Sequence, residues 1–470
     1  MPKPARLVRD ILRRPRPSAV RPPLTEPSLP YEAHLAAKAE RVWASLAQHV
    51  TCARRQVIAS APRAFRHKCN FGVWRSRPGN GPIGFAMVDP ATGGKVRVAG
   101  DQHFAASADI QLLMRRLLGP LNDSTAAARE ARRGLCTLTF YSTLAAGEPV
   151  GCEAPGREAP GREDTGHDGA GSSGQTRLPA LVALGYNRPL GEGWRTGWAL
   201  PAATALGATV VGRGAAQERR VAGGQEGNAG ELVQWFDVGG VRYPQHRRDG
   251  IFVQCNSAVC AQMLRWLKEV VEEEVEEEEA EEEGLTPGGR QRGRQRGRLL
   301  LEPYCGNGNA TLPLASSFDR VLASDLAPLS VAAAATCAQL VHASNVELRC
   351  VTAGQACKEA RGAGLLGDGD APATVLLNPP REGVVELQVL EAARHAQSVI
   401  YLSCNPVTLA RDLAALETTH HVTDAALFDQ FPHTPHAEVG VVLQRQRLTR
   451  RPRLTNSFRR EADTKPKVKV

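Results

Sequence analysis

Five short apolar runs in the second half of the chain alternate with Ala-rich segments that have helical spacing. The runs cover residues 299–302, 320–324, 346–351, 373–378 and 398–403. Strands that alternate with helices in this way form a parallel sheet with helices on both faces. The pattern therefore predicts an α/β fold with a doubly wound sheet, which binds its ligands at the carboxyl ends of its strands.

The first half of the chain has a different pattern, which predicts a second domain. Helical spacing from Tyr31 to Trp43 is followed by short alternating runs at 71–74, 84–88 and 181–186, with Gly and Pro between them. Alternating runs bounded by turn residues are typical of antiparallel strands. We therefore expect a mostly antiparallel α+β domain before the doubly wound one.

Polar segments interrupt both domains. Residues 151–178 hold a short tandem repeat followed by Gly, Ser and Asp, a composition that cannot form a core. Eleven Glu lie between residues 269 and 283, and Arg then alternates with Gly and Gln over 290–298. We interpret these two runs as a solvated spacer whose first part continues a helix from near Ala258, because Glu is a good helix former.

These features give five predicted segments. They are a basic tail at 1–28, a domain at 29–250 with the insertion 151–178, a helical linker with its charged insertion at 251–298, the doubly wound domain at 299–445 and a basic tail at 446–470. The first tail has seven Lys or Arg against two acidic residues, which fits either an organelle transit peptide or an arm that touches RNA.

Composition narrows the class of protein. No apolar run reaches the 18 or so residues that a membrane-spanning helix needs. The eleven cysteines are odd in number and scattered, which excludes a small disulfide scaffold and indicates a reducing compartment. The net charge of +9 favours an anionic partner.

Two strand ends suit an adenosine-containing cofactor. The first run leads into Glu302-Pro-Tyr-Cys-Gly-Asn-Gly-Asn309, where the glycines allow a tight turn and a close approach of the backbone to a ligand. Asp325 ends the next run, where an acid can bind a ribose diol. These features do not distinguish NAD from S-adenosylmethionine, and Asp325 taken alone also fits a helix cap.

Three further strand ends carry polar or reactive side chains. Asn378-Pro-Pro-Arg381 presents an amide on a stiff backbone. Ser403-Cys-Asn-Pro406 puts a thiol at the mouth of the predicted cleft, where Cys404 is either a reactive nucleophile or an inert cysteine. Glu438 precedes the apolar run 439–443 and so also lies at a strand end, as a functional carboxylate or as a salt-bridged edge residue.

Together these residues resemble the tRNA (uracil-5-)-methyltransferase family, bacterial type. The matching blocks are Phe252-Val-Gln-Cys-Asn256, Leu301-Glu-Pro-Tyr-Cys-Gly-Asn-Gly-Asn309, Asn378-Pro-Pro-Arg381, Leu402-Ser-Cys-Asn-Pro-Val-Thr-Leu409 and Phe428-Asp-Gln-Phe-Pro-His-Thr-Pro-His-Ala-Glu438. The last two blocks are long and highly specific. Shorter matches at 31–35, 65–68 and 193–195 extend the resemblance over about residues 31–445.

The resemblance implies a Rossmann-like S-adenosylmethionine-dependent methyltransferase domain at 299–445 and an RNA-binding N-terminal domain. The implied substrate is the T-loop uridine of tRNA, position 54, which leaves its stack to react. Arg66 and Lys68 are implied to hold the T-arm through phosphates. By resemblance Cys404 is the nucleophile that adds to carbon 6 of uracil, and Glu438 is the base that removes the carbon 5 proton. The family's cofactor-site positions are occupied by Gln254, Tyr304, Asn309, Asp325 and Asn378.

Two positions depart from the family's usual pattern. Asp325 stands where the family has Glu and keeps the charge. Asn378 stands where the family has Asp, so the amide keeps hydrogen-bonding capacity but lacks a negative charge near the sulfonium. Cys52, Cys69 and Cys136 are too widely spaced for the iron–sulfur cluster of the related rRNA enzymes, so the resemblance implies the tRNA branch, with no metal or cluster.

Two other functions are compatible with the same residues. Asn378-Pro-Pro also resembles the motif of methyltransferases that act on exocyclic amines and need no cysteine. The missing charge at Asn378 also suits a tRNA-binding folding helper with weak or absent catalysis. Nothing in the sequence indicates more than a monomer, and the compartment stays open between mitochondrion, plastid and cytoplasm.

Overall fold

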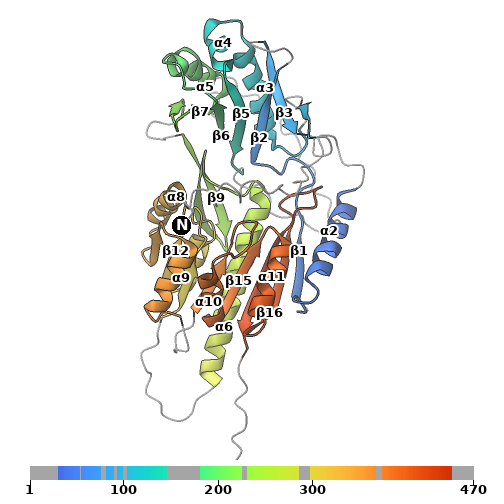
Figure 1. Cartoon of the computed structure of the whole chain (residues 1–470), viewed down its shortest axis with the longest axis vertical. Helices are drawn as coiled ribbons and strands as arrows, with labels where there is room; N and C mark the ends of the chain where they lie inside the picture. Colours follow the sequence, from blue (N-terminus) through green and yellow to red (C-terminus); the bar gives the residue numbers. More distant parts are fainter. Residues whose placement is uncertain are drawn as a thin grey trace, which may run out of the picture.

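The computed structural model describes residues 30–52, 54–75, 81–88, 93–98, 103–144, 180–224, 230–284, 297–366 and 373–446, without the side chains of 277–284. The predicted tail 1–28, the insertion 151–178, residues 285–296 of the spacer and residues 447–470 of the second tail lie outside this part of the chain. The described residues form two lobes stacked along the long axis of the molecule, with the smaller sheet at the top of Figure 1 and the larger sheet below it.

An eight-stranded sheet forms the lower lobe, in the order β1-β16-β17-β15-β14-β11-β12-β13. The strands are β1 (Arg54–Ile58), β11 (Leu299–Glu302), β12 (Arg320–Ser324), β13 (Val346–Arg349), β14 (Ala373–Leu377), β15 (Ser398–Ser403), β16 (His420–Phe428) and β17 (Glu438–Arg445). Strands β11 to β15 are mutually parallel, which confirms the five predicted runs and the doubly wound core. β17 runs antiparallel between β15 and β16.

Helices cover both faces of this sheet because its strands are apolar on both sides. One layer contains α6 (Ser257–Gly284), α7 (Thr311–Leu314) and α8 (Pro328–Leu340), with the hairpin of β9 (Glu231–Val238) and β10 (Val241–Arg248). The short turn η2 (Ala315–Ser317) follows α7. The other layer contains α2 (Tyr31–Leu46), α9 (Ala353–Gly362), α10 (Leu387–His395) and α11 (Pro406–Leu416). Alternation along each strand separates the layers, so that Leu300 faces the first and Leu301 the second.

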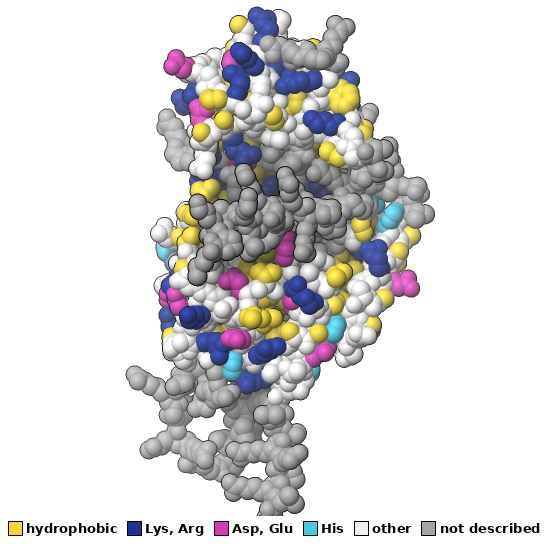
Figure 2. Space-filling model, in the orientation of Figure 1, with side chains coloured by type: hydrophobic (Ala, Val, Ile, Leu, Met, Phe, Trp, Pro, Cys, Tyr) yellow, Lys and Arg dark blue, Asp and Glu magenta, His cyan; other side chains and the backbone are white. Residues whose placement is uncertain are grey.

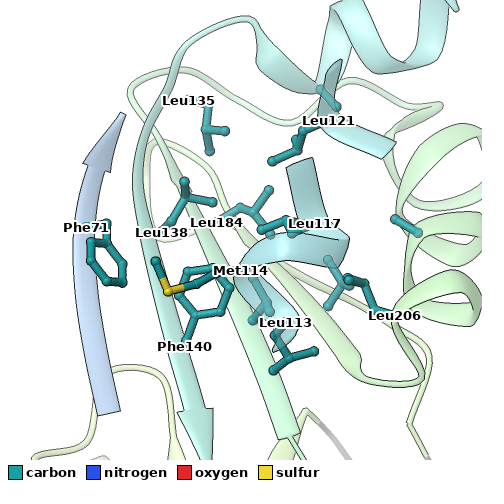
Figure 3. Packing of buried hydrophobic residues seen from close by; sticks show 14 of the residues in the cluster. Phe71, Leu113, Met114, Leu117, Leu121, Leu135, Leu138, Phe140, Leu184 and Leu206 are labelled. Carbon is teal, nitrogen blue, oxygen red and sulfur yellow. The ribbon is translucent and has the colours of Figure 1, made fainter. Parts of the chain in front are cut away.

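The upper lobe is a seven-stranded sheet in the order β4-β3-β2-β5-β6-β7-β8, antiparallel except for the pair β6–β7. Its strands are β2 (Lys68–Arg75), β3 (Ile83–Val88), β4 (Lys95–Val98), β5 (Leu135–Ser142), β6 (Ala180–Tyr186), β7 (Thr209–Arg213) and β8 (Arg219–Ala222). Its helical segments are α3 (Ala108–Asn122), α4 (Ala126–Arg132), the π-helical η1 (Trp194–Ala199) and α5 (Leu200–Leu206). Leu113 and Leu117 of α3 pack toward Phe140 of β5 in this core (Figure 3).

The structure places segments from both ends of the predicted domain 29–250 in the lower lobe, namely α2, β1 and the hairpin of β9 and β10. Residues 29–250 were expected to form one domain, but β1 pairs in parallel with β16 of the lower sheet. Helix α2 packs Val42 and Leu46 into the same lobe, where it lies beside β1 at the right of Figure 1. β1 joins this sheet because it covers the otherwise unpaired edge of β16. The two strands are far apart in the sequence, so no local sequence pattern predicts that they pair.

Two helices of the upper lobe, α3 and α4, lie between the predicted strand runs 84–88 and 181–186, where no helix was predicted. Ser107 and Thr125 begin them, because their hydroxyls accept hydrogen bonds from the Ile110 and Ala128 N–H groups. The predicted continuation of the helix from Ala258 into the Glu-rich run is confirmed, since α6 extends to Gly284.

Candidate active site

Cys404 and Glu438 meet at the carboxyl end of the parallel strands. β15 and β17 are antiparallel and pair Ser403 with Val439. Cys404 directly follows β15 and Glu438 is the first residue of β17, so they lie opposite each other one step beyond that pair. The thiol is half-buried, and the Glu438 side chain belongs to a residue only 3% exposed. The fold thus brings together two residues that came from separate sequence motifs.

The residues after Cys404 fix the turn that carries it. Asn405 caps α11 by accepting a hydrogen bond from the Val407 N–H (3.2 Å), and Pro406 takes the first helical position, where its missing N–H costs nothing. The Asn405 amide donates to the carbonyl of Arg381 (2.9 Å). The Cys-Asn-Pro sequence therefore anchors the thiol between a strand and a helix and ties it to the loop after β14.

Burial raises the pKa of both groups. Burial is the main cause that raises the pKa of the Cys404 thiol to about 11, and the neighbouring Glu438 carboxylate adds to this rise. Burial also raises the pKa of Glu438 to about 7. At neutral pH the thiol is protonated and the carboxyl is close to half ionised. Two neighbouring titratable groups with raised pKa values at one edge of a sheet are typical of an active site.

Arg381 supplies positive charge to this pair, a role that the sequence did not reveal. Its guanidinium opposes the effect of burial and lowers the pKa of both Cys404 and Glu438. Its carbonyl also accepts a hydrogen bond from the Thr408 hydroxyl (3.2 Å), so the Arg381 backbone is held against the start of α11. An arginine directly after two strand-end prolines was a visible signal, but only the pairing of β14 with β15 places it beside the thiol.

The glycine turn after β11 is tied to Asp325 at the end of β12. Gly306 and Gly308 have φ values of 55° and 78°, which glycine adopts without strain. Asp325 accepts hydrogen bonds from the N–H groups of Gly306 (3.0 Å) and Ala327 (2.8 Å). The second bond is the capping role left open by the sequence, and the first joins the acid to the turn. A Cβ added to Gly306 would meet no described atom within 4 Å, so this face of the turn is open.

Asn309 at the end of the turn is already engaged within the protein. Its amide nitrogen donates to Cys260 Sγ (3.3 Å), and its oxygen accepts from the Gln245 amide (2.6 Å). The Gln245 oxygen is buried and has no hydrogen-bond partner among the described residues. An unmet buried acceptor is costly unless a ligand satisfies it. Gln245 therefore joins the candidate binding site, although no sequence motif pointed to it.

Gln254, Tyr304 and Asn378 lie at the same edge of the sheet. Tyr304 and Asn378 follow the adjacent strands β11 and β14, and both side chains are half-buried. Gln254 is buried in the loop between β10 and α6. That loop is held by Asn256, whose amide donates to Ser60 Oγ (2.8 Å). The predicted cofactor-site residues are thus supplied by neighbouring strand ends and by the loop before α6.

A buried ion pair holds the segment that leads into Glu438. Asp429 accepts hydrogen bonds from Lys38 Nζ (2.5 Å) and from the Tyr31 hydroxyl (2.8 Å), both on α2. Lys38 also donates to the carbonyl of Phe431 (2.8 Å). Lys38 is 3% exposed and Asp429 is fully buried. Helix α2 therefore positions the loop between β16 and β17, which leads into Glu438.

The described part of the chain lacks the features of two other kinds of site. None of its helices combines the length and apolarity that crossing a membrane requires. The described residues also contain no cluster of three or more His, Cys, Asp or Glu side chains that could hold a metal ion.

Known proteins are similar to this chain over most of its length. A sequence model of the family described as tRNA (Uracil-5-)-methyltransferase matches residues 291–446. A protein of Ectopseudomonas mendocina named tRNA/tmRNA (uracil-C(5))-methyltransferase is 32% identical over 435 residues, which cover 90% of this chain and 99% of the relative. A protein of the same name from Chromohalobacter salexigens is 32% identical, with 90% of this chain and 98% of the relative covered.

One solved structure has a similar overall fold. It is the Pyrococcus abyssi tRNA (uracil-54, C5)-methyltransferase in complex with S-adenosyl-L-homocysteine. It superimposes with a TM-score of 0.53 at 16% sequence identity, and the match covers 92% of this chain and 87% of that one. At this identity the likeness concerns the fold alone.

Proposed function

This chain belongs to the tRNA (uracil-5-)-methyltransferase family, and from that premise we propose that it transfers a methyl group from S-adenosylmethionine to carbon 5 of the T-loop uridine of tRNA, position 54. The observation that carries the proposal is the pairing of Cys404 with Glu438 beside the positive charge of Arg381. Carbon 5 of uracil is a poor nucleophile, and a thiol next to a base overcomes that limit.

Cys404 starts the reaction by adding its Sγ to carbon 6 of uracil. The thiol proton leaves to solvent, and the electron pair of the C5=C6 bond moves toward the carbonyl at carbon 4, which makes carbon 5 nucleophilic. The pKa of the Cys404 thiol in the folded protein is about 11, so its thiolate needs stabilisation, which the positive charge of Arg381 supplies. When bound, S-adenosylmethionine supplies an electrophilic methyl group for carbon 5.

Glu438 completes the reaction as the general base. Its carboxylate takes the proton from carbon 5, the C5=C6 bond forms again and the Cys404 thiolate is expelled. Glu438 then returns this proton to Sγ, which restores the resting pair. A pKa of about 7 lets the same carboxyl accept and release a proton near neutral pH.

The cleft edge fits an adenosine-containing cofactor. We assign the ribose to Asp325, which sits beside the open face of the Gly306 turn. The unmet Gln245 oxygen next to Asn309 suits a ligand N–H or ammonium donor. Tyr304, Asn378 and Gln254 complete the proposed set.

The upper lobe and the loop before α6 are proposed to hold the T-arm. Phe252 is 73% exposed in the loop that contains Gln254, where its ring can stack on an unstacked base. Arg66 lies over the Phe431 ring (5.9 Å), and its Nε has no partner among the described residues. Lys68 Nζ donates to the Ile251 carbonyl (3.4 Å), so this proposed phosphate contact lies beside the loop that contains Gln254.

The test uses the full-length chain, radiolabelled S-adenosylmethionine and unmodified tRNA transcripts with uridine or cytidine at the target position. We expect label only with uridine, complete loss in Cys404→Ala, and normal labelling in Cys350→Ala, an exposed free thiol that serves as control. Labelling that survives Cys404→Ala would point to an amine methyltransferase. Tight tRNA binding without labelling by the folded wild type would point to the folding helper.

A further inference from the structure

The far end of the upper lobe carries a cationic depression that the proposed reaction does not use. It has a volume of about 610 Å³, and its lining includes Trp74, Arg75, Lys95, Arg132, Arg133 and Asn187. None of the described residues that line it is acidic. Lys and Arg side chains are frequent on the upper lobe in Figure 2, with few acidic ones among them. We call this feature the distal depression.

Arg75 and Arg132 are built into the distal depression. Arg75 donates to the backbone carbonyls of Arg132 (2.8 Å) and Leu135 (3.0 Å). Arg132 is 4% exposed and donates to the carbonyls of Leu121 and Asp123 (3.0 Å for the latter). One buried nitrogen of each, Nη1 of Arg75 and Nε of Arg132, has no hydrogen-bond partner among the described residues. Carbonyl dipoles orient these guanidinium groups without neutralising their charge.

Lys95 and Arg133 add two exposed cations at the same place. Neither forms an ion pair with any residue that the structure describes. The charges also act on one another, since burial and then the neighbouring Arg129 and Arg75 lower the pKa of Arg132. The Asp123 carboxylate acts on Arg132 in the opposite direction, but the residues that line the depression carry only positive charge. A concentration of positive charge with unused donors favours an anion. Half-buried Trp74 offers an aromatic surface beside them.

Strand β2 connects the distal depression to the catalytic lobe and sets its distance. Lys68 at the start of β2 contacts Ile251 in the loop that contains Gln254, and Arg75 is at the other end. Seven residue steps of about 3.3 Å separate these ends by roughly 23 Å. That span corresponds to roughly seven base pairs of a duplex. A loop bound at Cys404 cannot itself reach the distal depression, whereas an RNA stem that leads away from the loop can.

We propose that the distal depression binds backbone phosphates of the substrate tRNA at a part of the molecule outside the T-arm. This inference rests on the proposed function, because it takes a structured RNA with its target loop at Cys404. Guanidinium groups match phosphate oxygens geometrically, and such contacts position an RNA independently of its sequence. Trp74 would then face a sugar or a base next to the bound phosphate.

The test compares Kd values for full-length tRNA and for a minimal T-arm hairpin. The variant is Lys95→Ala/Arg133→Ala, which leaves the hydrogen-bonded Arg75 and Arg132 intact. We expect the Kd for tRNA to rise about tenfold, the slope of log K against log salt to fall by about 0.7–0.9 per lost contact, and the Kd for the hairpin to stay unchanged. Arg115→Ala/Arg116→Ala, on the exposed side of α3, is the control with the same change in charge.

Three results would overturn the proposal. They are an unchanged Kd for tRNA, an equal loss for tRNA and hairpin, and an equal loss in the α3 control, which would reveal only a general effect of charge. Melting temperatures of the variants show that the fold is intact, and Lys95→Glu/Arg133→Glu should weaken tRNA binding further. Because binding is measured without methyl transfer, a chain that binds through the depression but does not methylate would contradict the proposed function alone.

Discussion

Cys404 and Glu438 face each other because β17 runs antiparallel to β15. The last residues of β15 and the first residues of β17 lie at the same edge of the sheet, where Ser403 pairs with Val439. If β17 were parallel to β15, as β14 is, the start of β17 would lie at the opposite edge. The direction of one strand thus assembles the thiol and the carboxyl.

Replacing the base should trap the covalent intermediate. In Glu438→Gln, Cys404 can still add to uracil, but the carbon 5 proton has no base to accept it. We expect kcat to fall by at least about a thousandfold and a denaturation-resistant protein–RNA band to accumulate with tRNA and S-adenosylmethionine. Adding Cys404→Ala should abolish the band. Normal turnover by Glu438→Gln would show that another group removes the proton.

The reaction should accelerate with rising pH. In the proposed mechanism Glu438, with a pKa of about 7, acts as carboxylate, and Cys404, with a pKa of about 11, acts as thiolate. Both groups must be deprotonated, so kcat/KM should rise through pH 7 and continue to rise toward pH 9. The check is a profile of kcat/KM against pH, with controls for the stability of the tRNA at each pH. A maximum of kcat/KM below pH 7 would contradict these roles.

Arg381 should set the position of that profile. Its charge lowers the pKa of Glu438 and Cys404, so Arg381→Met should move the rising limb to higher pH and reduce kcat/KM by about 10- to 100-fold. Arg381→Lys retains the charge and should keep the limb near its original place. A loss of rate with no movement of the limb in Arg381→Met would mean that Arg381 acts only by positioning RNA.

A single substitution should alter cofactor binding at the end of β14. Asn378→Asp places a carboxylate next to the proposed sulfonium position. The attraction between the two charges, about 1 kcal/mol, should lower the KM for S-adenosylmethionine about fivefold. Asn378→Ala is the matched control and should raise it. An unchanged KM in both variants would place Asn378 outside the cofactor site.

The ion pair between α2 and the loop before Glu438 should matter for stability. Lys38→Met leaves the Asp429 carboxylate buried without its partner, and we expect a loss of about 3–5 kcal/mol in the free energy of unfolding. The double variant Lys38→Met/Asp429→Leu removes both charges and should recover part of it. Denaturant titration measures both, and equal stability of Lys38→Met and wild type would contradict the role assigned to the pair.

Local sequence accounted for the elements and for most of the candidate residues. The five parallel strands, the start of α2 and the glycine turn follow from periodicity and residue type over a few neighbouring positions. The prediction missed α3 and α4, although the buried residues of α3 recur at helical spacing from Ile110 to Leu121 and the hydroxyls of Ser107 and Thr125 cap the two helices. Cys404 and Glu438 were identified from motifs, but their roles came from resemblance.

By itself, the sequence determined that this chain contains a doubly wound domain with a thiol, a carboxylate and a glycine turn at its strand ends, because short-range spacing controls secondary structure. Only the tertiary structure decided that β1 joins β16, that Glu438 faces Cys404 and that Arg381 stands beside them. It also left the Gln245 side-chain oxygen without a hydrogen-bond partner among the described residues. These relationships join residues from distant parts of the chain. They depend on which strand edges and apolar faces meet, and no local pattern encodes that choice.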